Sequence, residues 1–465
     1  MKVLLLNPPY LRGYIHSARW DGISVSGSHW YPIFLAYTTG LLEKNGHECI
    51  LIDSEAENLT DSKIFERLRK FKPNFTVVYI SLRELKDNLS ISKRIKDKTG
   101  SKIIFVGPWC SMPNVKKICL KDNKNKKIVD YLIDGEFEFA TKDIVEGKEK
   151  RKMIITNRLT PEQLNKLPWV TKIYNKHLNI KNYKIGSLWY PFVDMFTGRK
   201  CYWGKCTFCL WPSTILKEGG YVFRDIDDVL DEMKWAVNNI EPKIKEIFIQ
   251  DDTPSAWRCK QIAEGLIERN IKISWSTYAR GDLTLTPEIL KLMKKSGCHC
   301  LHVGYESSSN KILKNINKGV TKEMLEEFTR RCNDADIDVH ADFMIGLPGE
   351  TDETARDTIE WAKKLKVVTY QFAPPKPYPC TPYYDWLVKN KLIDEEERPE
   401  YKEMDYKEMV EWCKKAMKEC YFNFGFLKRV IFKPHELKRL IRSAIFVIRY
   451  ILKKTEKELE EEYGK

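Results

Sequence analysis

With 465 residues, the chain is too long for one ordinary hydrophobic core, and its length indicates roughly three domains. The composition, 43% hydrophobic and 12% aromatic, is typical of a soluble globular protein, and no apolar run approaches the ~18 residues of a membrane span. The net charge of +14 comes from lysines scattered over the whole length. Without a zinc finger, an RNA-recognition signature or an Arg-rich arm, we expect no nucleic-acid partner.

The first residues, MKVLLLNPPY, contain an apolar run that is too short for an export signal and that predicts a buried strand. We therefore expect a cytoplasmic location, where the 13 cysteines are reduced thiols and not disulfides. Some of these thiols are expected to fill the core and others to bind metal.

Residues 1–145 repeat a pattern in which a short apolar run is followed by an amphipathic stretch. Five strands are predicted, at KVLLLNPP, CILIDSE, TVVYISL, KIIFVGP and VDYLIDGE. Continuous β-branched runs joined by helices indicate a parallel sheet covered on both faces, so this part is predicted to be a doubly wound α/β domain. Residues 146–190 lack a clear period and are interpreted as an ordered, aromatic connector.

Doubly wound domains bind ligands in the crevice at the carboxyl ends of their strands. The loops at those ends are NPPY, SLRE, GPWCS and GEFEF, and the residues expected to contact a ligand there are Pro8, Ser81, Gly107 and Gly135. The alternative is a purely structural domain, but the polar loops that carry Gly and Pro favour binding.

From residue 191 the alternation resumes, and six strands are predicted at FVDMFTG, EIFIQDD, ISWSTYA, CLHVGYE, DVHADFMIGLP and VTYQFAP. Six β/α units over residues 191–385 predict a partial (β/α)6 barrel, whose active site lies at the C-terminal ends of the strands. Residues 386–465 are expected to form a helical C-terminal region.

Three cysteines, Cys201, Cys206 and Cys209, follow the first of these strands in the stretch TGRKCYWGKCTFCLWP. Thiolates favour zinc or iron–sulfur clusters, but structural zinc needs four protein ligands. A [4Fe–4S] cluster held by three cysteines leaves one iron with an open position for a substrate or cofactor. The alternative, three thiols buried by chance, is disfavoured by their dense spacing at a strand end.

With these cysteines the chain resembles the radical S-adenosylmethionine (SAM) superfamily, whose motif is usually Cys-x3-Cys-x2-Cys with an aromatic residue before the last cysteine, as Phe208 is here. FIQDDT, YARGDL, VGYESSSNKILKNINKG and FMIGLPGETDET match that family in order. With its N-terminal sheet domain the chain resembles the cobalamin-binding subclass. The stretches HWYPIFLAYTTGLLEKNGHE and LPWVTKIYNKHLNIKNY are most similar to the hopanoid cyclitol-ether and calditol synthase group.

The resemblance implies that the three cysteines ligate a [4Fe–4S] cluster and that SAM chelates its fourth iron. One electron from an external donor, such as ferredoxin or flavodoxin, then gives a 5′-deoxyadenosyl radical that abstracts a substrate hydrogen. The residues expected to bind SAM are Phe208, Asp251, Arg280, Glu306 and Gly346.

Each of these residues has an expected role and a structural alternative. Phe208 would pack on the adenine, Glu306 would bind the ribose hydroxyls, and Arg280 would pair with the SAM carboxylate. Gly346 would allow a close backbone approach near the adenine, and either Asp251 or its neighbour would enter the cavity. The alternatives are core packing, surface ion pairs, a plain turn and a helix cap.

The chain also departs from the family pattern. Four residues separate Cys201 from Cys206, and Gly204 would absorb the extra one. The stretch PYPCT has Cys380 where relatives have Gly; this thiol is a candidate hydrogen-atom donor to a product radical, and an inert buried thiol is the alternative. The sheet domain lacks Asp-x-His-x-x-Gly, so a bound cobalamin is expected to have no protein His ligand.

Other cysteines and histidines are interpreted as structural. Cys298 and Cys300 face the same side of one strand and are expected in the core. The histidines His299, His302 and His340 are assigned no carboxylate partner at metal spacing.

The tail FKPHELKRLIRSAIFVIRYILKK predicts a basic amphipathic helix, which would either lie on the inner face of the membrane or dock on the barrel. The resemblance implies a small-molecule substrate or a sugar or polyol lipid headgroup, changed by rearrangement or C–C bond formation. The alternatives are cobalamin-dependent methyl transfer and a non-catalytic metal-binding or redox-sensing protein.

Overall fold

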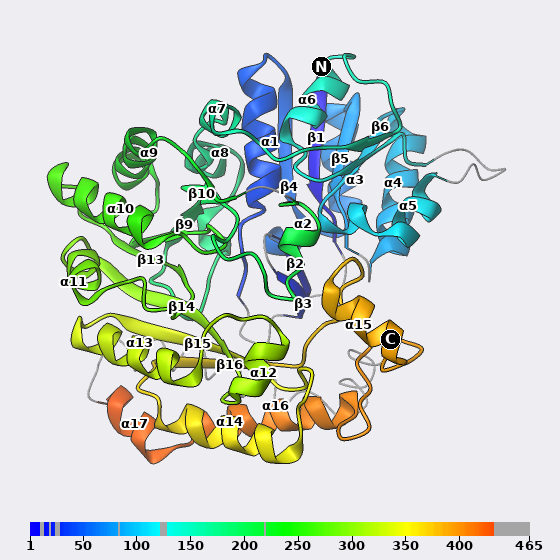
Figure 1. The fold of residues 1–465 in the computed structure, drawn as a ribbon. Helices are drawn as coiled ribbons and strands as arrows, with labels where there is room; N and C mark the ends of the chain where they lie inside the picture. Colours follow the sequence, from blue (N-terminus) through cyan, green and yellow to red (C-terminus); the bar gives the residue numbers. More distant parts are fainter. Residues whose placement is uncertain are drawn as a thin grey trace. The chain divides into compact units, whose positions relative to one another are not determined.

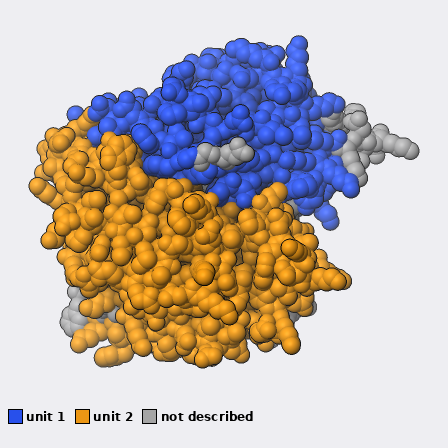
Figure 2. Space-filling view, viewed as in Figure 1, with its two compact units in different colours: residues 1–185, 190–200, 210–247 blue, residues 186–189, 201–209, 248–465 orange. Residues whose placement is uncertain are grey.

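The computed structural model describes residues 1–9, 14–17, 20–23, 28–81, 84–120, 128–217 and 220–431 (Figure 1). The chain divides into two compact units (Figure 2). Unit 1 comprises residues 1–185, 190–200 and 210–247, and unit 2 comprises residues 186–189, 201–209 and 248–465. The sequence-based boundaries at 145, 190 and 385 divide the chain differently and stay predictions.

Unit 1 contains a six-stranded sheet in the order β4-β1-β5-β6-β7-β8, and all its registers are parallel. Its strands are β1 (Lys2–Asn7), β4 (Glu48–Asp53), β5 (Phe75–Tyr79), β6 (Lys102–Val106), β7 (Tyr131–Asp134) and β8 (Met153–Ile155). The chain leaves β1 for β4 on one side and continues with β5 on the other, so the order reverses beside β1. A reversal of this kind opens a crevice at the carboxyl ends of the strands.

Helices separate these strands along the chain. They are α1 (Ile33–Lys44), α2 (Ser54–Glu57), α3 (Asp61–Phe71), α4 (Leu85–Thr99), η1 (Pro108–Ser111), α5 (Pro113–Leu120) and α6 (Glu138–Val145). Every residue of α1 from Ile33 to Leu42 is buried, whereas α3 and α4 bury one face. The doubly wound α/β fold predicted for this part is confirmed.

Five of the six strands coincide with predicted ones, and the sixth, β8, lies in the predicted connector. Three residues are too few to show a period of two, so β8 gives no sequence signal. The rest of the connector forms α7 (Pro161–Lys166), α8 (Val170–His177) and η2 (Ile180–Asn182). An antiparallel hairpin of β2 (Tyr14–Ser17) and β3 (Trp20–Ile23) was not predicted. Unit 1 also holds β9 (Phe192–Met195), β10 (Gly198–Arg199), η3 (Trp211–Ser213), β11 (Val222–Phe223) and α9 (Ile226–Asn239).

Unit 2 contains strands in the order β16-β15-β14-β13-β12, and the registers from β13 to β16 are parallel. They are β12 (Glu246–Ile249), whose last two residues belong to this unit, β13 (Ser274–Ala279), β14 (Cys298–Glu306), β15 (Asp338–Met344) and β16 (Thr369–Ala373). With β9, these are the six predicted strands. The sheet is open at β16, so it forms part of a barrel and not a closed one.

Helices follow these strands and begin at polar caps. They are α10 (Ala256–Glu268), α11 (Pro287–Lys295), α12 (Asn310–Asn315), α13 (Lys322–Asp334), α14 (Asp352–Lys364), α15 (Pro382–Asn390), α16 (Tyr406–Tyr421) and α17 (Phe424–Ile431). The side chains that cap the first seven of these helices are those of Ser255, Thr286, Ser309, Thr321, Thr351, Thr381 and Asp405. Each cap satisfies a backbone N–H that the helix itself leaves without a partner.

Strand β15 shows how the two faces of this sheet differ. Val339, Ala341 and Phe343 are buried, whereas the residues between them are half-buried. Because successive side chains point to opposite faces, one face is covered by helices and the other lines a more accessible interior.

The C-terminal region is helical in its described part. Tyr421 at the end of α16 donates its hydroxyl to the carbonyl oxygen of Tyr370 on β16 (2.9 Å) and accepts the backbone N–H of the same residue (3.0 Å). The basic amphipathic helix predicted after residue 432 lies outside the described residues. Among the residues that the structure describes, none of the helices combines the length and apolar character needed to cross a membrane.

Candidate active site

The three cysteines of the motif lie on one loop of unit 2, between residues 201 and 209. All three are half-buried and outside any disulfide. Cys201 forms a parallel bridge with Thr253, which follows β12, and the backbone N–H of Cys209 donates to the carbonyl oxygen of Cys206 at 3.2 Å. The loop therefore lies at the carboxyl end of the sheet, as predicted from the sequence.

Hydrogen bonds to the end of α12 hold this loop. The backbone N–H of Thr207 donates to Ile316 at 3.0 Å, and the Trp203 indole donates to the carbonyl oxygen of Asn317 at 2.9 Å. The amide of Asn317 donates in return to the carbonyl oxygen of Lys205 at 3.1 Å. Gly204 has a φ of +61°, the left-handed region in which glycine is favoured, so the extra residue of the motif falls where the backbone can turn.

Two cations, Lys318 and Arg280, act on the Cys206 thiol. Burial raises the pKa of Cys206, and Lys318 and Arg280 oppose this rise. A cluster with thiolate ligands carries negative charge, so these cations suit it. Among the described residues, no three His, Cys, Asp or Glu side chains are placed to hold a single metal ion. Cysteines that bind different irons of one cluster need no such convergence, and the donor set fits a [4Fe–4S] cluster.

A buried ion pair lies next to the cysteines. The Lys318 Nζ is 2.6 Å from the Glu306 Oε1, and the two side chains are 8% and 7% exposed. Burial favours the neutral amine, but the Glu306 carboxylate holds the pKa of Lys318 above its usual range. Glu306 itself has a φ of +61°, unusual for a residue other than glycine. Lys318, in the stretch NINKG, was not singled out from the sequence because its partner is 12 positions away.

Arg280 is fixed from three sides. Its Nη2 donates to the carbonyl oxygen of Lys318 at 2.7 Å, and its Nε lies 3.2 Å from the Asp282 carboxylate. Its guanidinium stacks on the Trp203 ring of the cysteine loop, 4.5 Å from the ring centroid. Arg280 therefore joins the strand end to the loop, and its role toward the SAM carboxylate stays a prediction.

The remaining predicted SAM residues are less closely grouped. Asp251 is fully buried after β12, and it raises the pKa of Cys259 on α10, where burial is the larger cause. A Cβ at Gly346 would lie 2.3 Å from the Met409 sulfur, so packing against α16 requires this glycine. Phe208 is half-buried on the cysteine loop. None of these roles is tested by the structure.

Cys380 lies in the turn before α15 with a φ of +73°. The backbone there has the left-handed conformation that glycine prefers, which agrees with the glycine of the family pattern. The thiol is half-buried and outside any disulfide, and its role as a hydrogen-atom donor stays a prediction.

The other predicted structural residues are placed as follows. Cys298 and Cys300 are fully buried core residues, as predicted. His340 has a carboxylate neighbour that the sequence analysis did not assign, because its Nε2 lies 3.2 Å from the Asp342 carboxylate and its Nδ1 lies 2.7 Å from the Thr369 hydroxyl. Its interpretation as a structural residue stays a prediction. The partner was missed because Asp342 is two residues along the same strand, where the two side chains share a face.

In unit 1, the four predicted ligand residues follow the ends of neighbouring strands. Pro8, Ser81, Gly107 and Gly135 come after β1, β5, β6 and β7, respectively. Gly107 and Gly135 have φ values of +111° and +121°. A Cβ at Gly135 would lie 2.3 Å from the Thr156 hydroxyl oxygen, so part of the space at this edge is filled by the chain itself.

Buried hydrogen-bonding atoms without a partner among the described residues lie on α4, the helix that follows β5. The Oδ1 of Asn88, in the first turn of α4, accepts the backbone N–H of Ser81 at 3.1 Å. The Asn88 Nδ2 and the Ser92 hydroxyl are buried and have no hydrogen-bond partner among the described residues. Buried polar groups are usually satisfied, so these atoms fit a polar ligand at the strand ends.

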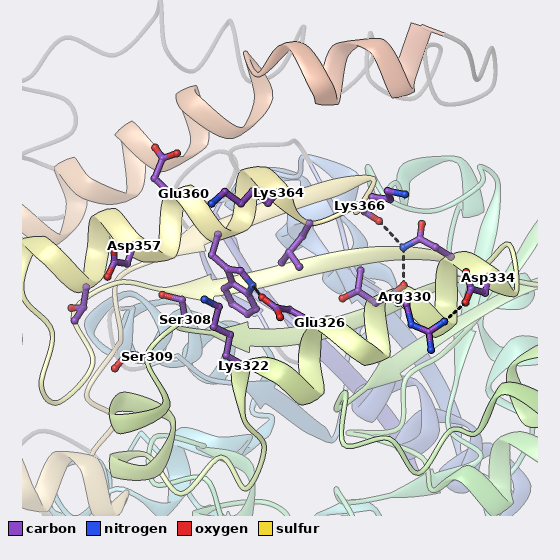
Figure 3. A pocket seen from close by; sticks show the side chains of 15 residues that line it. Ser308, Ser309, Lys322, Glu326, Arg330, Asp334, Asp357, Glu360, Lys364 and Lys366 are labelled. Carbon is purple, nitrogen blue, oxygen red and sulfur yellow. Dashed lines mark hydrogen bonds and ion pairs between the residues drawn. The ribbon is translucent and has the colours of Figure 1, made fainter.

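A separate groove of about 740 Å³ lies on the outer side of unit 2, between α13 and α14 (Figure 3). Charged side chains line it, and the Trp361 indole donates to Glu326 across it at 2.7 Å. Trp361 also packs on Tyr305, whose neighbour Glu306 points to the opposite face of β14. The groove therefore lies on the helix-covered side of the sheet, away from the cysteines.

Residues 195–362 match the sequence model of the Radical SAM superfamily. They include the three cysteines and the Glu306–Lys318 pair, so the match covers the site described above. This protein is a radical SAM superfamily enzyme.

Relatives of this radical SAM enzyme match along nearly the whole chain. An uncharacterized methyltransferase of Pyrococcus horikoshii is 27% identical over 96% of this chain and 98% of its own length. The anaerobic magnesium-protoporphyrin IX monomethyl ester cyclase of Rubrivivax gelatinosus is 22% identical over 96% of this chain and 82% of its own length.

Solved structures with the same fold include two radical SAM enzymes. The methyltransferase TsrM from Kitasatospora setae has a TM-score of 0.65 at 17% identity, over 84% of this chain and 76% of its own. The cobalamin-dependent enzyme OxsB has a TM-score of 0.60 at 15% identity, over 84% of this chain and 55% of its own. At these identities the likeness shows the fold. The finer resemblance to the hopanoid and calditol synthase group is not shown by these relatives.

Proposed function

We propose that this radical SAM enzyme is a cobalamin-dependent methyltransferase acting on a small molecule. The observation that carries the proposal is the pairing of two features in one chain. Unit 2 holds three cysteines near a buried Lys318–Glu306 pair, and unit 1 has two buried donors on α4, the helix after β5, without a hydrogen-bond partner among the described residues.

The residues of unit 2 have defined tasks in this proposal. Cys201, Cys206 and Cys209 would hold a [4Fe–4S] cluster that leaves one iron to SAM, and Arg280 would fix the loop through Trp203. The Glu306 carboxylate, held by Lys318, would accept hydrogen bonds from SAM hydroxyls. When bound, the cluster and SAM supply a radical that abstracts hydrogen, with the electron from an external donor, and cobalamin supplies a transferable methyl group.

The residues of unit 1 would hold the cobalamin. Asn88, which accepts the Ser81 N–H after β5, offers its amide Nδ2, and Ser92, four residues along α4, offers a hydroxyl. A corrinoid carries many amide side chains, which such groups can hydrogen-bond. Support also comes from the names of the relatives, since TsrM is described with cobalamin and a [4Fe–4S] cluster and OxsB as cobalamin-dependent.

Rearrangement or C–C bond formation on a sugar or polyol headgroup, the first reading of the sequence, is less well supported. The Pyrococcus relative and TsrM are both described as methyltransferases, and none of the relatives named above is described as acting on a polyol. A lipid headgroup and a membrane contact also depended on the tail, which lies outside the described residues.

The test is label transfer. The anaerobically reconstituted protein, with a corrinoid and a reductant, is incubated with a metabolite extract and SAM that carries a deuterated methyl group. We expect a metabolite that gains the label with the wild-type protein but not with Cys206→Ala. SAM cleavage without label transfer to any metabolite would reject methyl transfer and leave the radical SAM activity standing.

A further inference from the structure

The cysteine loop and α12 of unit 2 are joined by hydrogen bonds at their outer ends. The carbonyl oxygen of Lys205 accepts the Asn317 amide at 3.1 Å, and the Asn317 backbone N–H donates to the carbonyl oxygen of Lys314 at 3.0 Å. Lys311 lies one turn earlier on α12, and residues three positions apart share a helix face. Lys205, Lys311 and Lys314 therefore belong to one patch, which we call the lysine surface.

The three lysines of this surface are exposed to solvent, whereas Ile312 and Leu313 on the same helix are buried. Within the part of the chain that the structure describes, none of the three ammonium groups has an ion pair or a hydrogen bond. The Lys205 ammonium only lies over the Trp203 ring, 5.0 Å from its centroid. Such charges are available to a complementary charge on another molecule.

Acidic residues are missing from both chain segments that form the lysine surface. Residues 201–209 and 307–320 contain lysines but neither Asp nor Glu. In the whole chain, by contrast, 65 acidic side chains nearly balance 79 basic ones. The lysine surface is therefore more basic than the chain as a whole.

The carboxylates next to these segments do not remove this excess. Glu306 is paired with Lys318, and Asp282 is paired with Arg280. Glu323 accepts the side-chain amide of the first residue of α12 at 3.1 Å. The lysine surface therefore keeps a net positive charge, which attracts an anionic partner over about 8 Å in physiological salt.

The lysine surface is continuous with the proposed cluster site. Lys205 directly precedes Cys206, so their α-carbons are about 3.8 Å apart. The Trp203 ring, which Lys205 contacts, also stacks on the buried Arg280 guanidinium at 4.5 Å. A partner that contacts Lys205 thus lies next to a proposed cluster ligand.

This position favours one class of anionic partner. A radical SAM enzyme receives an electron from an external donor. Electron-transfer complexes are small and transient, with less than about 1,200 Å² of buried surface, and charge complementarity speeds their formation. Nucleic acid is another polyanion, but its binding usually involves more phosphate contacts than three lysines provide.

We propose that Lys205, Lys311 and Lys314 form the docking surface for an acidic protein that donates one electron. The donor is oxidised by one electron and the cluster held by the cysteine loop is reduced by one, so no further reactant is needed. The proposal rests on the part of the proposed function that assigns the cluster to this loop, and it does not depend on methyl transfer.

The test measures how an acidic flavodoxin in its oxidised form binds to the full-length, anaerobically reconstituted protein. An NMR titration of isotope-labelled flavodoxin gives the dissociation constant at low and at physiological salt. Lys311→Glu/Lys314→Glu is expected to weaken binding about tenfold at low salt, because two attractions become repulsions. Wild-type binding is expected to weaken as salt is added.

A matched control changes the same number of charges elsewhere in unit 2. Lys364 and Lys366 are exposed lysines of the outer groove between α13 and α14, on the helix-covered side of the sheet (Figure 3). Lys364→Glu/Lys366→Glu is therefore expected to bind flavodoxin as the wild type does.

The rate of reduction separates docking from damage to the cluster site. With dithionite, the wild type and both double variants are expected to be reduced at the same rate. With reduced flavodoxin, only Lys311→Glu/Lys314→Glu is expected to be slower, by about tenfold at low salt. Lys205→Gln removes one charge from the loop itself and is expected to have a smaller effect in the same direction.

Three results would overturn the docking surface. The first is equal flavodoxin binding by the wild type and Lys311→Glu/Lys314→Glu, and the second is an equal loss in the Lys364→Glu/Lys366→Glu control. The third is binding of a single-stranded RNA that requires Lys311 and Lys314 while flavodoxin binding does not. The proposed function is judged separately, from iron content, SAM cleavage with dithionite and label transfer by the wild-type protein.

Discussion

Lys318 and Glu306 place two charges in a part of unit 2 where both are almost fully buried. Removing charges from water is unfavourable, so such a pair persists only when its partners satisfy each other. The Lys318 side chain lies between the Glu306 carboxylate and the Cys206 thiol, and both raise its pKa. The pair therefore connects the cysteine loop with the end of β14.

Lys318→Met is expected to destabilise the protein by about 3–5 kcal/mol, because Glu306 would be left as an unpaired buried carboxylate. The double variant Glu306→Gln/Lys318→Met should recover most of this loss. Urea unfolding under anaerobic conditions measures both. If the double variant is as unstable as the single one, Lys318 contributes through its packing and not through its charge.

Glu350 at the start of α14 predicts a pH effect on stability. Burial raises its pKa from 4.5 to about 7, while bonds from the Thr354 hydroxyl (2.6 Å) and the Gly346 N–H (3.1 Å) oppose the rise. Between pH 4.5 and 7 the folded state holds a proton that the unfolded state has lost, so stability falls as the pH rises through this window, by up to about 3 kcal/mol.

Glu350→Gln removes this titration. Its amide oxygen can still accept the Gly346 N–H, and its amide nitrogen can donate to the Thr354 hydroxyl. We expect the difference in unfolding free energy between the variant and the wild type to shift in favour of the variant from pH 5 to about 7.5. Denaturant unfolding at several pH values measures it. A constant difference would mean that Glu350 titrates near its ordinary value in the folded protein.

Strands and helices with a clear hydrophobic pattern could be predicted from the sequence. Elements that depend on contacts with distant parts of the chain could not. Continuous apolar runs identified β1, β5 and β6, which are buried on both faces. The three-residue β8 and the hairpin β2–β3 have too few residues for a period to show. In the site, the cysteine spacing identified the loop, but the pairing of Lys318 with Glu306 depends on how separate elements pack, which no local pattern records.

Gly135 and Gly147 differ in how closely other atoms pack against them. Gly135→Ala would place a Cβ 2.3 Å from the Thr156 hydroxyl and 2.9 Å from its carbonyl oxygen, whereas Gly147, also at positive φ, has nothing within 4 Å. We expect Gly147→Ala, at a φ of +75°, to cost about 1 kcal/mol from backbone strain. Gly135→Ala should cost clearly more, from the close contacts and from a φ of +121° that L residues rarely adopt. Thermal unfolding compares them. Equal losses would show that β8 moves away without cost.

At the scale of the whole molecule, the chain divides into two compact units, each of which contains one of the two proposed cofactor sites. The cysteine loop lies entirely in unit 2, and Ser81, Asn88 and Ser92 lie entirely in unit 1. The residues proposed above for each cofactor therefore belong to one unit.

This division predicts that each cofactor can be lost without the other. Cys201→Ala/Cys206→Ala/Cys209→Ala should lose iron and still retain a corrinoid after reconstitution with hydroxocobalamin. Asn88→Asp/Ser92→Ala should lose the corrinoid and keep about 4 iron atoms per chain, because Asn88→Asp preserves the acceptor for the Ser81 N–H and changes only the donor. Iron analysis and visible spectra of the same samples measure both quantities.

If the cysteine variant loses the corrinoid as well, the cluster contributes to the cobalamin site. If the Asn88→Asp/Ser92→Ala variant keeps its corrinoid, those two donors are not the binding groups, and the strand-end residues Pro8, Gly107 and Gly135 become the ones to change next.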